Sequence, residues 1–310
     1  MSDQKYQQQL DQDVLAFIDK VESFMPADVA SYTIEQQREV YLDLCRHFHA
    51  GHPEGVSTTD FMIETEECAV PIRNYKTTKR QATAHIIYYH GGGFVIGGLD
   101  SHDDVCAELC DQTGFNVTSV DYRLAPENTH PAAFNDALAA YEHVVAMADL
   151  PIILSGDSAG ATLAAVVAHA TRQHAIKPAG QVLIYPALGS DMTVGSYLEH
   201  AEAPMLTTED MRFYYQAFSG GKETKDDPTF LPLMDTDYSG LPPAYIVTAG
   251  CDPLRDDGRD YQQRINAAGG QVEWVNEAGL VHGYLRARHS VKEARKSFGR
   301  IVAAFLALHQ

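Results

Sequence analysis

The segment PIILSGDSAGATLAAVVAHA (residues 151–170) is the most informative part of the sequence about the fold. It begins with an apolar run typical of a strand buried on both faces, and it continues as a helix of small residues that can pack closely on a sheet. Between the two lies GDSAG (156–160), which matches the pattern Gly-x-Ser-x-Gly. A serine that merely caps the helix would be the simpler interpretation. The position between a buried strand and a small-residue helix instead favours a sharp turn that projects the hydroxyl of Ser158 from the sheet edge.

The same alternation of strand and helix extends to both sides of this turn. FMIETEE (61–67) and AVPIRNY (69–75) predict a hairpin, and Ser101 is the expected N-cap of the helix that ends near Gly114. Further strands are expected at HIIYY (85–89), NVTSVDY (116–122), GQVLIYPAL (180–188), PAYIVTAG (243–250) and QVEWVNEAG (271–279). Such alternation predicts an α/β fold with a mostly parallel central sheet that is flanked by helices.

Two segments fall outside this alternation. Residues 1–50 have apolar side chains at helical spacing, and residues 190–220 contain a capped helix rich in aromatic side chains. Both stripes could simply bury against the core. The alternative is a lid over the carboxyl ends of the strands, where ligands bind in open α/β sheets.

The charge of the chain restricts the partners that it can bind. Its 310 residues include 42 acidic and 23 basic ones, for a formal net charge of −19. We therefore expect no nucleic acid and no anionic membrane as a partner, because both require positive surface patches. The N-terminus lacks the pattern of a signal peptide, and no apolar stretch approaches the ~20 residues of a membrane span.

The five cysteines indicate a reducing compartment. Their number is odd and their positions are scattered, which favours free thiols and a cytoplasmic location. No Cys-x-x-Cys pair or neighbouring histidine cluster indicates a metal site, so we expect no metal.

The glycines of HGGG (90–93) come directly after a predicted buried strand. If Ser158 attacks a carbonyl group, negative charge develops on the carbonyl oxygen, and backbone N–H groups aimed at that oxygen stabilise it. A glycine loop lets such N–H groups approach a substrate without an intervening side chain. The expected donors are the N–H groups of Gly92, Gly93 and Ala159.

His90 and Gly91 are expected to support this loop. His90 precedes the serine, whereas α/β hydrolases place the serine first, the acid second and the histidine third. It is therefore predicted to brace the loop by hydrogen bonding rather than to act as a base. A plain glycine turn is the simpler interpretation, and a phosphate-binding loop would need a helix directly after the glycines.

The same order selects the partners of Ser158. His282 follows the last predicted strand, in a loop at the carboxyl end of the sheet, and His289 is the weaker alternative. Asp252 directly follows the preceding strand. Ser158 would attack, His282 would transfer the proton, and Asp252 would orient the imidazole and stabilise its charged form.

The chain resembles the hormone-sensitive-lipase-like esterases, the bacterial family with a His-Gly-Gly-Gly oxyanion loop, and within it most closely the acetyl esterases. Each matching segment is short, but six of them in the right order are jointly specific. They are HGGGFVIGGLDSHD (90–103), DYRLAPE (121–127), GDSAGA (156–161), LTTEDM (206–211), DPLRDDG (252–258) and HGY (282–284).

The resemblance implies an α/β-hydrolase fold with a helical cap. Residues 1–55 would form the N-terminal part of the cap and residues 190–225 an inserted part. The catalytic core would then consist of residues 56–189 and 226–310. The resemblance also implies a supporting acid near the site at Glu127, for which an ion pair with a buried arginine is the simpler interpretation.

The resulting hypothesis is a cofactor-free serine carboxylesterase that cleaves short-chain acyl esters through an acyl-enzyme intermediate. Its partner would be a small-molecule ester, and the chain would be a monomer or a homodimer. Tyr284 stands where the family often has phenylalanine, so the pocket rim is expected to be slightly more polar. The aromatic residues that could bound the acyl pocket, at least half of them as ordinary core, are Phe17, Phe24, Phe213, Tyr214, Tyr215 and Phe218.

Two other functions use the same residues. An amidase-type hydrolase, such as an aryl formamidase, would need the same catalytic groups. A non-catalytic ligand-binding receptor or regulator on this scaffold would commonly have lost one of the three residues Ser158, Asp252 and His282, which are all present.

Overall fold

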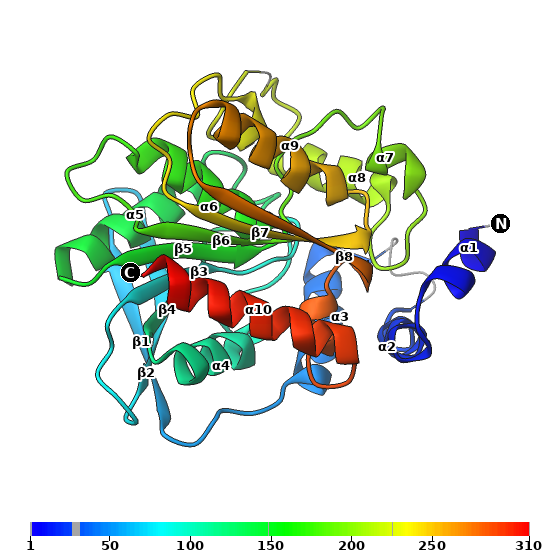
Figure 1. The fold of residues 1–310 in the computed structure, drawn as a ribbon, viewed down its shortest axis with the longest axis horizontal. Coiled ribbons are helices and arrows are strands. Elements are labelled where there is room, and N and C mark those ends of the chain that lie inside the picture. The colour runs from blue at the N-terminus through cyan, green and yellow to red at the C-terminus, as the bar shows by residue number, and fades with distance from the viewer. Residues whose placement is uncertain (1, 27–31, 148, 225, 310) are drawn as a thin grey trace.

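The computed structural model describes all residues except 1, 27–31, 148, 225 and 310. Its centre is an eight-stranded sheet in the order β1-β2-β4-β3-β5-β6-β7-β8 (Figure 1). The two pairs that involve β2 are antiparallel, and all other neighbouring strands run parallel. The strands are β1 Val56–Glu64, β2 Ala69–Thr77, β3 His85–Tyr89, β4 Asn116–Val120, β5 Ile152–Asp157, β6 Gly180–Ile184, β7 Ala244–Cys251 and β8 Val272–Val281.

Strand β3 shows why the sheet is buried on both faces. Ile86 and Tyr88 belong to the hydrophobic cluster on one face, whereas Ile87 and Tyr89 belong to the cluster on the other. None of the four side chains is exposed to solvent. Because successive side chains of a strand point to opposite faces, an unbroken apolar run requires helices on both sides. The predicted α/β-hydrolase fold is confirmed.

Helices cover both faces of this sheet. Helices α4 and α10 contact one face, and α5, α6 and α9 contact the other (Figure 1). The helices are α1 Ser2–Gln9, α2 Gln12–Glu22, α3 Ile34–Phe48, α4 Asp103–Thr113, α5 Ala132–Met147, α6 Ala159–Thr171, α7 Ser196–Glu199, α8 Thr208–Ser219, α9 Arg255–Ala267 and α10 Lys292–Leu308. Short 3-10 turns are η2 Leu99–Ser101, η3 Pro232–Met234 and η4 Tyr284–Ala287.

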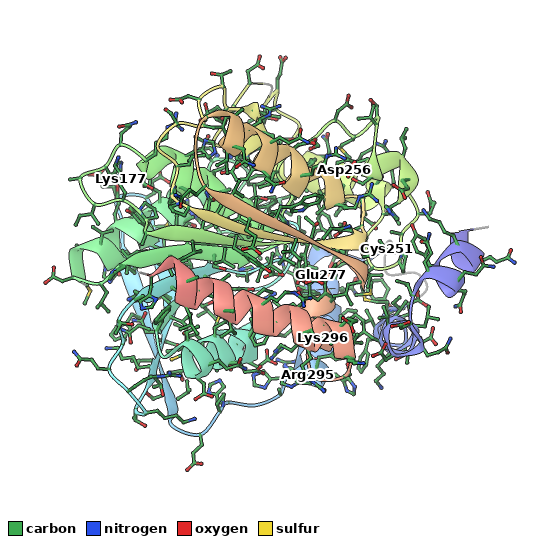
Figure 2. All side chains as sticks on the ribbon, in the orientation of Figure 1. Lys177, Cys251, Asp256, Glu277, Arg295 and Lys296 are labelled. Atoms are coloured by element: carbon green, nitrogen blue, oxygen red, sulfur yellow. The ribbon has the colours of Figure 1, made fainter. Side chains whose placement is uncertain are left out.

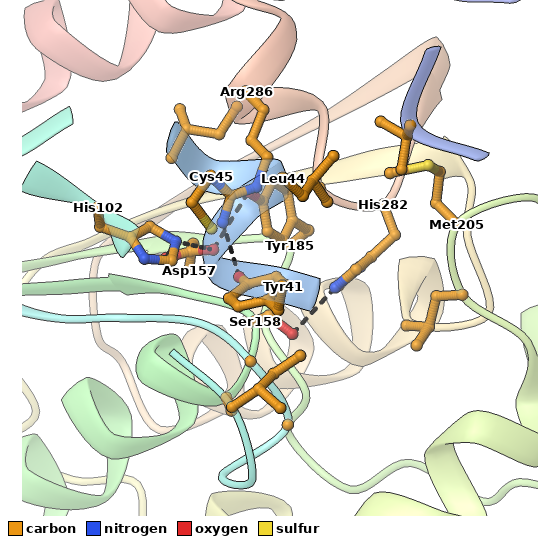
Figure 3. Close-up of a pocket in the computed structure, with 18 of the residues that line it drawn as sticks. Tyr41, Leu44, Cys45, His102, Asp157, Ser158, Tyr185, Met205, His282 and Arg286 are labelled. Carbon is orange, nitrogen blue, oxygen red and sulfur yellow. Dashed lines mark hydrogen bonds and ion pairs between the residues drawn. The ribbon is translucent and has the colours of Figure 1, made fainter. Parts of the chain in front are cut away.

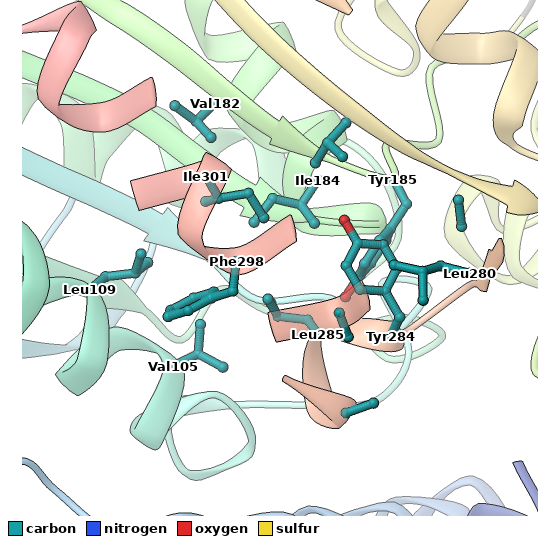
Figure 4. Packing of buried hydrophobic residues seen from close by; sticks show 14 of the residues in the cluster. Val105, Leu109, Val182, Ile184, Tyr185, Leu280, Tyr284, Leu285, Phe298 and Ile301 are labelled. Atoms are coloured by element: carbon teal, nitrogen blue, oxygen red, sulfur yellow. The ribbon is translucent and has the colours of Figure 1, made fainter. Parts of the chain in front are cut away.

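The packing under α10 fixes the position of the chain after β8. Phe298 and Ile301 of α10 are buried in one cluster with Val105 of α4 and Ile184 of β6 (Figure 4). Tyr284 of η4 belongs to the same cluster, and its hydroxyl group lies 2.7 Å from that of Ser297. Turn η4, which follows the candidate base, is thereby held against the core.

The two segments outside the strand–helix alternation are helical, as predicted. The apolar stripe of the N-terminal segment is buried at Leu10, Val14, Phe17, Ile18 and Val21. Helix α8 begins with a capping box, in which the Thr207 hydroxyl accepts from the N–H of Asp210 and the Asp210 carboxylate accepts from the N–H of Thr207.

The expectation that Ser101 caps α4 is wrong by one residue. The N-cap position of α4 is held by His102. The Ser101 hydroxyl instead donates to the Gly98 carbonyl at 2.7 Å and accepts from the Gly98 N–H, so it closes the η2 turn before the helix begins.

Some charged side chains extend from the outer surface of the helices into solvent. Arg295 and Lys296, for example, extend from the outer side of α10 (Figure 2). All five cysteines are free and four are buried, including Cys251 at the end of β7. Within the described ranges, no helix is both long and apolar enough to cross a membrane.

Candidate active site

Ser158 occupies the sharp turn that the sequence predicts between β5 and α6. Its backbone has φ 52° and ψ −120°, a region that residues with side chains rarely adopt, and its N–H donates to the Ile184 carbonyl at 2.9 Å. Gly160 must be glycine, because a Cβ at this position would overlap the Tyr89 carbonyl of the neighbouring strand. This close packing of strand and helix stabilises the strained turn.

His282 links the serine to a buried carboxylate. Its Nε2 lies 2.9 Å from the Ser158 hydroxyl oxygen, and its Nδ1 lies 2.7 Å from Asp252 Oδ2 (Figure 3 shows the first contact). Asp252 has no exposed surface, and its other oxygen accepts from the Leu254 N–H at 2.9 Å. The structure thus brings together the three residues selected from the sequence, at distances suited to proton transfer.

The alternative base, His289, lies elsewhere. Its ring is half-exposed, and its Nε2 lies 2.6 Å from the Glu108 carboxylate. The geometry therefore favours His282 as the partner of Ser158.

The glycine loop lies beside the serine and lines the same cavity. In the described part of the chain, the N–H groups of Gly92, Gly93 and Ala159 donate to no other group. Gly93 has a φ of +60°, and a Cβ there would overlap the ring of Tyr214 in α8. The loop can therefore present free N–H groups to a ligand only if residue 93 has no side chain.

His90 lies behind this loop. Its Nδ1 contacts the Gly91 carbonyl at 2.9 Å, and its ring stacks on Tyr122 at a centroid distance of 4.3 Å. Burial, reinforced by the nearby His102, lowers the pKa of His90 to about 4, so the ring is neutral at neutral pH. These contacts suit a bracing role better than that of a base.

Asp157 is a buried acid that the sequence reading did not assign. Its Oδ1 accepts from the Gly91 N–H at 3.0 Å and from the Tyr88 hydroxyl at 2.8 Å, and it lies 3.2 Å from His102. Burial alone would raise its pKa, but the contact with His102 and these hydrogen bonds hold the pKa well below the usual range. Its place directly before Ser158 was the available signal, because the carboxylate ties the serine turn to the glycine loop.

A cavity of about 230 Å³ opens onto these groups. Its walls come from α2, α3, α8, the glycine loop and η4. The side chains drawn in Figure 3 include residues from segments that are distant in sequence. The cavity is also lined by residues that were not predicted from the sequence, among them Tyr41, Leu44, Cys45, Tyr185, Met205 and Arg286.

Only two of the six aromatic candidates line this cavity, namely Tyr214 and Tyr215. Phe218 stacks on Phe94 in the core at a centroid distance of 3.8 Å, and Phe213 is exposed. Phe17 and Phe24 pack against the N-terminal part of the core. The expectation that at least half would be core is confirmed.

The expected effect of Tyr284 on the pocket rim is wrong. Its side chain is buried away from the cavity, and its hydroxyl is paired with that of Ser297. The two neighbours Gly283 and Leu285 line the cavity instead.

Glu127 does not contact the candidate triad. Its carboxylate forms two hydrogen bonds with the Arg38 guanidinium, at 2.8 and 2.7 Å. The ion pair with an arginine is thus the observed arrangement, but about half of the Glu127 side chain is exposed, so the pair is not buried.

One cluster of possible metal ligands lies away from the serine, in the described part of the chain: His49, His52 and Asp103. The Asp103 carboxylate already accepts from Arg73 and Tyr75. The Nδ1 of His49 accepts from the Gly51 N–H, which places the proton of a neutral ring on Nε2, the atom that faces Asp103. A metal would have to displace that proton, so we assign these residues to structural hydrogen bonding.

Comparison with known proteins shows the family to which the chain belongs. Residues 86–286 match a family described as having an alpha/beta hydrolase fold. The chain is 39% identical to the esterase LipI of Mycobacterium tuberculosis over 288 residues, which cover 89% of each protein. It is 32% identical to the ethyl acetate hydrolase of Pseudomonas putida over 267 residues, which cover 82% of this chain and 83% of that protein.

The solved structure of an ester hydrolase has the same fold. The ester hydrolase EH1AB1 from the metagenome of Lake Arreo superposes with a TM-score of 0.89 at 32% identity, covering 96% of this chain and 98% of that one. These relatives are ester hydrolases and do not favour the amidase alternative. The chain therefore belongs to the hormone-sensitive-lipase-like family of α/β hydrolases and is a carboxylic ester hydrolase.

Proposed function

We propose that the enzyme hydrolyses esters of short-chain carboxylic acids through an acyl-enzyme formed on Ser158. The observation that carries this proposal is the unbroken chain of hydrogen bonds from Ser158 through His282 to Asp252. His282 takes the proton of the serine hydroxyl as the oxygen attacks the ester carbonyl, and it then gives that proton to the departing alcohol. Asp252 keeps the proton of the neutral ring on Nδ1 and stabilises the imidazolium.

The second half of the reaction repeats the first with water. Water gives a proton to His282 and attacks the acyl-enzyme, and Ser158 leaves with that proton as the acid is released. In both halves the N–H groups of Gly92, Gly93 and Ala159 stabilise the carbonyl oxygen as it becomes negative. These residues supply the nucleophile, the base and the donors, so the proposed chemistry needs no cofactor.

The size of the cavity supports a short acyl chain. An apolar cavity of about 150 Å³ holds a benzene molecule, and the cavity here measures about 230 Å³. Similarity to an ethyl acetate hydrolase points in the same direction.

Since α2, α3 and α8 supply part of the wall, we assign residues 1–55 and 190–225 to a cap over the core.

A series of p-nitrophenyl esters from acetate to decanoate tests this function. We expect kcat/KM to be highest among the short members and to fall steeply once the acyl chain outgrows the cavity. A p-nitrophenyl amide or an aryl formamide at the same concentration should react far more slowly. A maximum at decanoate, or faster cleavage of the formamide, would contradict the proposal.

A further inference from the structure

Arg286 introduces a positive charge into the wall of the cavity. It belongs to η4, four residues after His282, and it lines the cavity on the side of α3 (Figure 3). One Nη donates to the Tyr41 hydroxyl at 2.7 Å, and the other donates to the Ser101 carbonyl at 3.3 Å. These two contacts hold the guanidinium in place but use only part of its five N–H donors.

Within the described residues, no carboxylate lies within 4.0 Å of the Arg286 guanidinium. The contrast with Arg288, which also lines the cavity, is sharp. Arg288 pairs with both Asp104 and Glu108. Asp157 attracts Arg286 from a greater distance, but its oxygens accept hydrogen bonds from other groups, among them Tyr88 and the Gly91 N–H.

The surroundings of the Arg286 guanidinium suit it to bind a negatively charged group of a ligand. The cavity wall includes the apolar side chains of Leu44, Val105 and Leu285, besides the carboxylates of Asp104 and Asp157, which are engaged by other groups. A charge that is partly removed from water gains most from a partner of opposite charge. A guanidinium also matches the geometry of a carboxylate, which can accept two of its N–H groups at once.

We propose that Arg286 binds a carboxylate of the substrate, so that the preferred ester is a half ester of a short dicarboxylic acid or a short hydroxy acid that is acylated on its hydroxyl group and keeps its carboxylate free. This inference rests on the proposed function. In the reaction, water adds its oxygen to the acyl carbon, the alcohol leaves with a proton, and the bound carboxylate is unchanged. The net charge of −19 repels anions at long range, so the preference has to come from this local contact.

Two matched substrate pairs test the proposal, one for each side of the ester bond. The first pair is the p-nitrophenyl half ester of glutarate and the p-nitrophenyl ester of glutaramic acid. The second is γ-acetoxybutyrate and γ-acetoxybutyramide. The two members of each pair differ only in that one has a carboxylate where the other has a neutral amide. The measured rates are corrected for uncatalysed hydrolysis.

We expect the carboxylate ester to have the higher kcat/KM in at least one pair. The measured quantity is the ratio of the kcat/KM of the carboxylate ester to that of its neutral counterpart. Arg286→Met should lower this ratio about tenfold or more, since a charge-assisted contact is lost. Tyr41→Phe, which keeps the charge but removes a group that holds it, should lower the ratio by a smaller factor. Arg212→Met removes an exposed guanidinium of α8 and should leave the ratio unchanged.

A measurement on the unmodified enzyme guards against a variant that fails to fold. Glutarate should inhibit competitively at a lower concentration than glutaramide. Equal inhibition by both, or a substrate ratio that Arg286→Met leaves unchanged, would overturn the role of Arg286. If neutral esters are cleaved in that case, the proposed function stands, whereas failure to cleave any ester would overturn the proposed function itself.

Discussion

Two buried aspartates have pKa values shifted in opposite directions. Asp157 is held ionised by His102 and Tyr88. Asp257 is buried with no ion-pair partner among the residues that the structure describes, and burial raises its pKa to about 7, although the N–H groups of Leu188 and Gly189 oppose the shift. The difference shows that the partners, and not burial as such, decide the charge of each group.

The raised pKa of Asp257 predicts how stability depends on pH. The folded pKa of about 7 exceeds the ordinary value of 3.8, so the native state holds a proton that the unfolded chain loses earlier. The resulting stability is fully present below about 3.8 and is lost as the pH rises through about 7. We expect Asp257→Asn to flatten the fall of the free energy of unfolding over this range.

Urea unfolding at several pH values measures that effect. Asp43→Asn removes an exposed carboxylate of α3 and is the matched control. In this variant the free energy of unfolding should fall with pH at the same slope as in the unmodified protein. Some slope should remain in Asp257→Asn, because burial also raises the pKa of Asp121, to about 6. An identical slope in both variants would rule out the assignment.

Helix α3 is tied to the glycine loop by one arginine. Arg38 donates to the Val95 carbonyl at 2.8 Å and to the Ala125 carbonyl at 3.0 Å, while Glu127 fixes its guanidinium. The N–H of Val95 in turn donates to the Gly92 carbonyl. The N-terminal segment thus helps to hold the loop whose N–H groups we assign to the oxyanion site.

This connection predicts a defect in turnover for Arg38→Met. Misplacing the donors weakens the transition state more than the bound ester, so kcat should fall about 10- to 100-fold while KM changes little. Arg38→Lys can reach one carbonyl and should restore part of the rate. Arg46→Met, on an exposed position of the same helix, should behave like the unmodified enzyme. A change confined to KM would contradict the positioning role.

The order of the sheet brings distant residues to one edge. Ser158 follows β5, Asp252 follows β7, His282 follows β8, and the glycine loop follows β3. Because these four strands run parallel, their carboxyl ends lie on the same side of the molecule. This arrangement explains how four short motifs can serve one cavity.

The same arrangement decides what could be predicted from sequence. Ser158, Asp252 and His282 each follow a recognisable strand, so topology alone brings them together. Tyr41 and Arg286 are 245 positions apart and carry no motif. Their contact depends on how α3 packs against η4, which the pattern of apolar residues does not specify. For the same reason Tyr284 could not be assigned to the core in advance.

In the proposed mechanism Ser158 is the nucleophile and His282 is its base. Mass spectrometry after treatment with diethyl p-nitrophenyl phosphate identifies the nucleophile, because the attacking oxygen displaces p-nitrophenolate and keeps the phosphoryl group. We expect one adduct per chain, on Ser158, with none in Ser158→Ala. Labelling should slow about a thousandfold or more in His282→Ala and stay near the original rate in His289→Ala. An adduct that persists in Ser158→Ala would show another nucleophile, and slow labelling in His289→Ala alone would show that His289 is the base.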